Sequence, residues 1–313
     1  MITYLLEIFN IVLPVFLVVG LGYGLKRSSL LNDGFLFQLN KLAYYLALPL
    51  LLFYKIASAE FSASFNLSLV FGLALTVFAG FCLSYIFAVI KGYSNEVRGT
   101  FTQCAFRGNL AYIGLAIAFN AYGENGLATA GVLLGFIVPV LNFFSIIALL
   151  LPHKENRLQP VLFVRQILYN PLIVASFVGI GWSFLKLPIP TVFDNALHIV
   201  TGMALPLALL SIGASFSLKK LRGDLTIAFL ATGMKLLIMP AVTAALLVAL
   251  GVRGMDLGIG VLFAGTPTAA AAYIFTQQMR GDAELAGAII MLTTLLSVVT
   301  YTIILFALKT IGV

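Results

Sequence analysis

The sequence has very little charge for its length. Asp, Glu, Lys and Arg make up 9% of its 313 residues, whereas 61% of the residues are hydrophobic. A soluble globular domain of this size needs far more charge on its surface. The mean hydropathy is +1.09, and the few charged residues gather in short clusters between long apolar segments. These features predict a protein that is solvated by a lipid bilayer.

Cysteine and histidine are also scarce. Cys82 and Cys104 both lie inside apolar segments, and the two histidines, His153 and His198, lie in a loop and near a span end. No spacing of these residues fits a metal site or a disulfide framework. The sequence also lacks a His-Glu-x-x-His helix and a pair of deep aspartates. We therefore predict no metal, no cofactor and no enzymatic activity.

Ten apolar segments are long enough to span a bilayer, which takes about 20 residues. They lie near residues 3–25, 37–58, 67–90, 100–120, 126–150, 162–185, 194–216, 225–249, 257–278 and 284–308. The loops between them leave no room for a soluble domain. The first segment lacks a basic start and a cleavage site, so we expect it to remain as a helix. The predicted fold is an all-α polytopic membrane protein with ten transmembrane helices.

Lysine and arginine are unequally divided between alternate loops. One side has ten of them and the other has three: Lys26, Arg27, Lys91, Arg98, Lys154, Arg157, Lys219, Lys220, Arg222 and Arg280 against Lys186, Arg253 and Lys309. The basic side is expected to be cytoplasmic, which puts both termini in the periplasm of a bacterial-type inner membrane. This rule also accounts for the pI of about 9.4, so we predict no nucleic-acid partner.

The two halves of the chain share landmarks at an offset of 157 residues. Pro14 corresponds to Pro171, and Leu48-Pro49-Leu50 corresponds to Leu205-Pro206-Leu207. Chance identities are common in so apolar a chain, but these fall on rare prolines in equivalent spans. We predict one five-helix repeat over residues 1–150, a cytoplasmic linker over 151–161 and a second repeat over 162–313. Because five is odd, the second repeat enters from the opposite side, as in many secondary transporters.

The fourth span of each half is interrupted by glycine and polar residues. The first contains Arg107-Gly108-Asn109 and the second contains Gly265-Thr266-Pro267-Thr268, with Gly108 and Gly265 at the same offset. Such residues weaken the helical hydrogen-bond ladder, and paired breaks are a pointer to a transport site. A simple kink is the alternative, and for Pro14, Pro49, Pro139 and Pro240 we expect only kinks.

Two cations are placed deep in the predicted spans. Arg107 lies about seven residues inside the fourth span and Lys235 about ten residues inside the eighth, which are depths of roughly 10 and 15 Å. No Asp or Glu lies equally deep. Deep cations without deep carboxylates predict a site for an anion, although snorkelling to the surface is the alternative. The candidate substrate-binding residues are Arg107, Gly108, Asn109, Tyr112, Asn142, Lys235, Gly265, Thr266, Pro267, Thr268 and Tyr273.

The whole chain resembles the auxin efflux carrier family, which belongs to the group of bile-acid, arsenite and riboflavin transporters. The resemblance rests on an ordered set of short motifs. They are Leu13-Pro14-Val15-Phe16, Asn40-Lys41, Leu48-Pro49, Phe106-Arg107-Gly108-Asn109, Asn170-Pro171-Leu172, Lys235-Leu236, Met239-Pro240 and Pro267-Thr268-Ala269-Ala270. Relatives often have proline two residues after the glycine that matches Gly114, where this chain has Ala116. The first break is therefore expected to be softer than in those relatives.

The resemblance implies a fold and a function. Helices 1, 2, 6 and 7 would form a scaffold, and helices 3–5 and 8–10 a transport domain in which helices 4 and 9 cross as broken helices. Such carriers move malate, malonate, other carboxylates or auxin by an elevator-type motion. We therefore expect a secondary transporter of a small organic anion. The alternatives are a sodium-coupled carrier of a larger bile-acid-like anion and an anion channel, and the sequence leaves Na+ or H+ coupling and a homodimer open.

Overall fold

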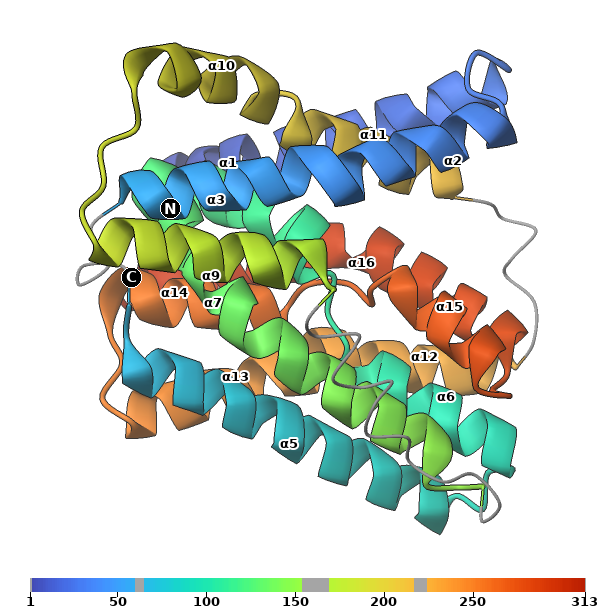
Figure 1. The fold of residues 1–313 in the computed structure, drawn as a ribbon. Helices are drawn as coiled ribbons and strands as arrows, with labels where there is room; N and C mark the ends of the chain where they lie inside the picture. The colour runs from blue at the N-terminus through green and yellow to red at the C-terminus, as the bar shows by residue number, and fades with distance from the viewer. Residues whose placement is uncertain (1, 60–64, 154–168, 217–223, 313) are drawn as a thin grey trace. The chain divides into compact units, whose positions relative to one another are not determined.

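The computed structural model describes residues 2–59, 65–153, 169–216 and 224–312 (Figure 1). Almost all of these residues are helical, and the described residues contain no strand beyond one isolated bridge. The prediction of an all-α protein is confirmed. Residues 154–161 of the expected linker lie outside the described residues, as do Lys154, Arg157, Lys219, Lys220 and Arg222.

The structure describes the following helical elements in the two halves of the chain. In the first half they are α1 (Ile2–Arg27), α2 (Asp33–Leu42), η1 (Ala43–Ala47), α3 (Leu48–Ser58), α5 (Leu67–Ile90), α6 (Asn95–Phe106), η2 (Leu110–Gly114) and α7 (Leu115–Leu150). In the second half they are α9 (Pro171–Phe184), α10 (Thr191–Thr201), α11 (Ala204–Ser215), α12 (Leu225–Gly233), η4 (Met234–Ile238), α13 (Met239–Ala249), α14 (Gly254–Ala264), α15 (Ala271–Gln278) and α16 (Ala283–Thr310). In each half the fourth expected span contains a non-helical break.

Seven helical stretches of the described chain are long and apolar enough to cross a membrane. The shorter apolar helices α9 and α14 add to them. The longest stretch, Leu110–Leu150, has 41 residues and would measure roughly 60 Å, about twice a bilayer core. Gly123 has φ 62° and ψ −149° inside it, so a sharp bend joins the expected fourth and fifth spans. The chain is an integral, multi-pass membrane protein.

One expected span is interrupted, although residues 191–215 are together long and apolar enough to cross a membrane. Residues 194–216 form two helices, α10 and α11, which are separated at Gly202 and Met203. Pro206 explains why α11 begins where it does. It lies in the first turn of α11, where the N–H that proline lacks would have no partner within the helix.

Two of the three π-helical turns in the described residues are followed by a proline. Pro49 follows η1 and Pro240 follows η4, each by two residues. A proline ring clashes with the carbonyl four residues earlier, which here lies inside the π turn, and the wider turn relieves that clash. The simple kinks expected at these two prolines are therefore π turns. Ala116 has the same position after η2, so η2 forms without a proline.

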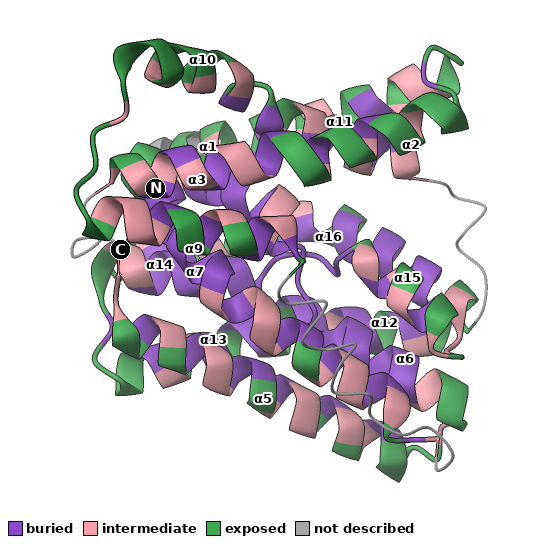
Figure 2. Cartoon of the chain, viewed as in Figure 1, coloured by how far each residue is buried: buried purple, intermediate pink, exposed green. Residues whose placement is uncertain are grey.

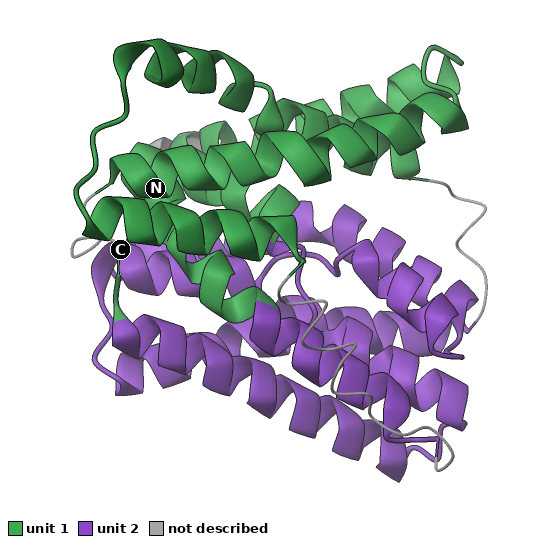
Figure 3. Cartoon of the chain, viewed as in Figure 1, with its two compact units in different colours: residues 1–66, 111–138, 164–216 green, residues 67–110, 139–163, 217–313 purple. Residues whose placement is uncertain are grey.

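The chain divides into two compact units (Figure 3). Unit 1 comprises residues 1–66, 111–138 and 164–216, and unit 2 comprises residues 67–110, 139–163 and 217–313. In unit 1, α1 packs against α11 and α3 packs against α9. Gly22 touches the backbone of Leu210, and Gly213 touches the backbone of Val19, so neither position has room for a side chain. These contacts bring α1 and α11 together backbone to backbone.

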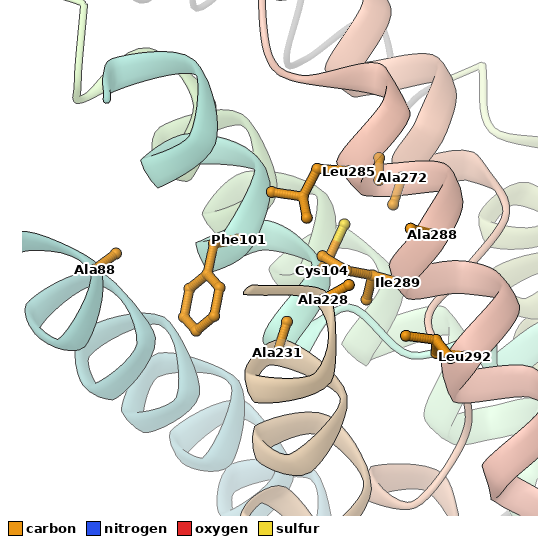
Figure 4. Close-up of a cluster of buried hydrophobic side chains, with 11 residues drawn as sticks. Ala88, Phe101, Cys104, Ala228, Ala231, Ala272, Leu285, Ala288, Ile289 and Leu292 are labelled. Atoms are coloured by element: carbon orange, nitrogen blue, oxygen red, sulfur yellow. The ribbon is translucent and has the colours of Figure 1, made fainter. Parts of the chain in front are cut away.

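Unit 2 is built around a core of small side chains. Alanines from α5, α12, α15 and α16 surround Phe101 and Cys104 of α6 (Figure 4). The members of this core are Ala88, Phe101, Cys104, Ala228, Ala231, Ala272, Leu285, Ala286, Ala288, Ile289 and Leu292. Small residues let helices approach closely, which matters in a membrane because lipid is as apolar as leucine. As a result, residues 99–110 are buried without interruption (Figure 2).

Candidate substrate site

The first break ends α6 at Phe106. The last helical hydrogen bond runs from the Arg107 amide to the Gln103 carbonyl over 3.0 Å, and Arg107 itself has extended backbone angles of −75° and 98°. Helical structure resumes with η2 at Leu110. The predicted break is therefore confirmed, and it is three residues long, 107–109.

The second break ends α14 at Ala264 and lasts until α15 begins at Ala271. Gly265 closes α14, and Pro267 follows inside the break, where it has no N–H to donate. Residues 257–269 are buried throughout. Both predicted breaks are therefore buried, apart from Ala270 at the end of the second.

The two breaks pair with each other. The Asn109 amide donates to the Pro267 carbonyl over 2.8 Å, and the Ala269 amide donates to the Arg107 carbonyl over 3.0 Å. Between these bonds, Gly108 and Thr268 form an antiparallel bridge. Unwound backbone is tolerated at membrane depth only where protein or water satisfies it. Each break supplies those partners to the other, and the two broken helices cross at this point.

Threonine hydroxyls complete the hydrogen bonding around the crossing. The Thr268 hydroxyl donates to the Cys104 carbonyl in the last turn of α6 over 2.8 Å. The Thr268 amide donates to the Thr293 hydroxyl over 3.1 Å, and that hydroxyl donates back to the Ile289 carbonyl of α16 over 2.7 Å. The Thr266 hydroxyl donates to the Phe263 carbonyl over 2.7 Å. Three elements are thereby fixed to the second break.

The close packing around residue 108 leaves room only for glycine. A Cβ atom at this position would overlap the Thr266 hydroxyl and would lie 3.2 Å from Leu110 Cδ2 and 3.4 Å from Lys235 Nζ. Any other residue would displace the Thr266 hydroxyl, which belongs to the opposite break.

Arg107 is held by neutral side chains. Its two terminal nitrogens donate to Ser145 Oγ over 2.8 Å and to Asn142 Oδ1 over 2.7 Å, both on α7. Its guanidinium carbon lies 4.4 Å from the centre of the Phe275 ring. The side chain is only 7% exposed. These two acceptors orient the guanidinium, and neither carries a formal charge.

Lys235 lies in the π turn η4 and is 1% exposed. Its ammonium donates to the Ala264 carbonyl at the end of α14 over 2.5 Å. It therefore contacts the crossing from the side of the second break, whereas Arg107 belongs to the first.

The described carboxylates of unit 2 lie at helix N-termini and not beside these cations. Asp224 and Asp282 cap α12 and α16, accepting from amides of the first turn. Glu96, Asp256 and Glu284 lie in the first turns of α6, α14 and α16. Negative charge is stabilised at helix N-termini, and hydrogen bonds from its own backbone amide and from Ser94 lower the pKa of Glu96. Described carboxylates of unit 2 thus lie at helix starts, and its two deep cations lie at the breaks.

Ten of the eleven predicted site residues lie in unit 2, and Tyr112 lies in η2 of unit 1. Tyr273 is half-buried on α15 and accepts from the Gln277 amide over 3.1 Å. Sequence reasoning missed Ser145 and Phe275. Ser145 follows Asn142 by three residues, so the helical face shared by the two polar side chains could have revealed it. A lone phenylalanine gives no such signal.

Comparison with known proteins identifies the group to which the chain belongs. Residues 7–305 match the family described as membrane transport protein. The chain belongs to this transporter family. It is 27% identical to an uncharacterized transporter of Methanothermobacter thermautotrophicus over 92% of this chain and 94% of the relative. It is also 26% identical to a Rhizobium meliloti protein named "Putative malonate transporter", over 97% of this chain and 96% of the relative.

Part of the chain also matches a plant protein. It is 28% identical to auxin efflux carrier component 2 of Arabidopsis thaliana over 129 residues, which cover 39% of this chain and 20% of the plant protein. The resemblance to the auxin efflux carrier family is confirmed. The relatives are transporters and not enzymes.

Proposed function

We propose that this transporter carries a small organic anion, with a carboxylate of the malonate or malate class as the leading candidate and an auxin-like acid next. The observation that carries the proposal is Arg107. Its buried guanidinium is held at a helix break by two neutral acceptors, Asn142 and Ser145. The malonate relative named above supports the same class of solute.

The charge distribution supports an anion over a cation. Described carboxylates of unit 2 lie at helix N-termini, whereas Arg107 and Lys235 lie at the crossing. A carboxylate that entered beside Arg107 would gain a charge-assisted hydrogen bond, and guanidinium geometry suits its two oxygens. A cationic solute would meet two like charges instead.

The proposed mechanism is elevator-type alternating access across the inner membrane, with both termini in the periplasm. Helices 3–5 and 8–10 would carry the site past helices 1, 2, 6 and 7. The compact units support part of this division, because α1–α3 and α9–α11 lie in unit 1 and α5, α6 and α12–α16 lie in unit 2. Residues 111–138, which belong to expected helices 4 and 5, group with unit 1.

Uptake of labelled malonate, malate and indole acetate into proteoliposomes tests the proposal. Arg107→Ala should reduce the initial rate at least about tenfold, since a hydrogen bond to a charged group contributes about 1.5–3 kcal/mol. Arg107→Lys should lose less, because it keeps the charge. Arg98→Ala is the matched control: this arginine is on the same helix but donates to the Tyr93 carbonyl near the helix start, and its removal should leave uptake near wild type.

The melting temperature of each purified variant separates loss of function from loss of fold. A folded Arg107→Ala protein that takes up carboxylates at the wild-type rate would contradict the proposed role of Arg107. Single-channel currents in place of saturable uptake would favour an anion channel.

A further inference from the structure

The C-terminal end of α14 has a partner for each of its last four carbonyls. The Gly265 amide donates to Val261, the Tyr301 hydroxyl to Leu262 and the Thr266 hydroxyl to Phe263. The Ala264 carbonyl is left, and it accepts from the ammonium of Lys235. The final carbonyls of a helix lack partners within the helix and carry the negative end of its dipole. A cation is the partner that this end favours.

The position of that ammonium is fixed from two sides. It donates to Ala264 at the second break, and it lies close enough to Gly108 that a Cβ atom there would be 3.4 Å from Nζ. The π turn η4 that carries Lys235 packs against α6 and α16. The ammonium therefore lies at the crossing itself, 1% exposed, and does not reach toward a surface.

In transporters with broken helices, the C-terminal ends of half-helices and unwound carbonyls are the places where coupling cations bind. We propose that Lys235 is a resident cation that takes the place of such an ion at the end of α14. The crossing is then held together without sodium, and the transporter binds no inorganic cation at this break. Lys235 acts as a positioning residue: its charge fixes α14 against α6, and Arg107 faces the solute.

This inference deepens the proposed function by addressing its coupling, and it rests on that function only where uptake is measured. The main test needs no solute. The melting temperature of the purified protein is compared in sodium, potassium, choline and n-propylammonium chloride at equal ionic strength. The wild type should melt within about 1 °C in all four, since a cation stabilises the fold only by binding to it.

Three variants make the test specific. Lys235→Ala removes a volume close to that of n-propylammonium, so it should melt lower in choline and recover by at least about 2 °C in n-propylammonium or sodium. Lys235→Met fills the same space without charge, so it should melt lower with no recovery in any salt. Met239→Ala is the control, because it removes a buried uncharged side chain one helical turn further along and should show no cation dependence.

Each result bears on the proposal. Stabilisation of the wild type by sodium over choline would overturn it, as would a Lys235→Ala protein that behaves like Lys235→Met in every salt. If Lys235→Ala cannot be purified, the melting temperatures of the wild type and of Lys235→Met in the four salts still test the proposal. For carboxylate uptake, the rate should be unchanged when choline replaces sodium outside the vesicles. Failure to transport any carboxylate would contradict the proposed function while leaving the melting test intact.

Discussion

The two breaks in unit 2 differ in length and chemistry. The first spans three residues, 107–109, and contributes a guanidinium and an amide side chain. The second spans six residues, 265–270, and contributes two hydroxyls, a proline and small side chains without formal charge. The two positive charges at the crossing thus belong to Arg107 of the first break and to Lys235. The second break supplies hydroxyls and backbone groups that fix the crossing in place.

This difference follows from how each helix ends. The first break leaves α6 with an extended Arg107, which directs its side chain toward polar groups of α7. The second needs more chain because Pro267 cannot donate and because Thr266 and Thr268 use their hydroxyls to cap carbonyls of α14 and α6. A charged residue in place of Thr266 or Thr268 would remove one of these caps. Carrying the charge on the shorter break leaves the caps intact.

The largest effect on uptake is expected where the two breaks touch. Gly108→Ala should abolish measurable carboxylate uptake and lower the free energy of unfolding by about 1–3 kcal/mol, because the added Cβ would overlap the Thr266 hydroxyl. Thr266→Ala removes that hydroxyl, so the double variant Gly108→Ala/Thr266→Ala should recover part of both losses. Proteoliposome uptake and thermal melting measure the two effects.

Gly233→Ala is the matched control for this substitution. Gly233 ends α12 in the same unit, has helical backbone angles, and a Cβ built upon it would meet no atom within 4 Å beyond its own stretch of helix. It should keep uptake and stability near those of the wild type. A Gly108→Ala protein that is equally tolerant would mean that the breaks do not touch as described.

The smallest effect is expected just after η2, where the helix resumes beyond the first break. Ala116→Pro should change the free energy of unfolding by at most about 1 kcal/mol and leave uptake within about twofold of the wild type. The reason is that Pro49 and Pro240 have the same position after their own π turns, so η2 already has the shape that precedes a proline. Melting temperature and initial uptake rate measure the outcome.

Ala118→Pro provides the contrast, because it places the same ring two residues further into α7. It should cost about 3 kcal/mol or more, as proline does in a helix interior. Equal loss at residues 116 and 118 would show that η2 is not equivalent to the two proline-linked turns.

Much of this architecture could be predicted from the sequence, because it depends on side-chain type and spacing. Apolar length predicted the spans, and Gly108 and Gly265 predicted the two breaks. The π turns could not be predicted, since a proline in a span signals a kink without specifying the hydrogen-bond pattern. The division of residues 194–216 at Gly202 was missed for a similar reason, because by composition these residues form one continuous apolar segment.

The chemistry of the site was predictable only in part. Arg107 and Asn142 stand out as polar residues in apolar spans, and the structure brings them together. The partner of Lys235 is a backbone carbonyl, and the partners of Asn109 and Ala269 are also backbone groups. Every residue has such groups, so sequence cannot single out the ones that a break exposes. Phe275 was equally invisible, because the sequence contains 26 phenylalanines.

The central claim is that the guanidinium of Arg107 receives the anion, and Asn142 offers the most direct test. Asn142→Asp replaces the neutral acceptor 2.7 Å from the guanidinium with a carboxylate, and Asn142→Ala removes the acceptor without adding charge. The initial rate of carboxylate uptake should be at least about tenfold lower for Asn142→Asp than for Asn142→Ala, because a buried carboxylate would pair with the guanidinium in place of the solute. Uptake by folded Asn142→Asp at or above the Asn142→Ala rate would contradict the account.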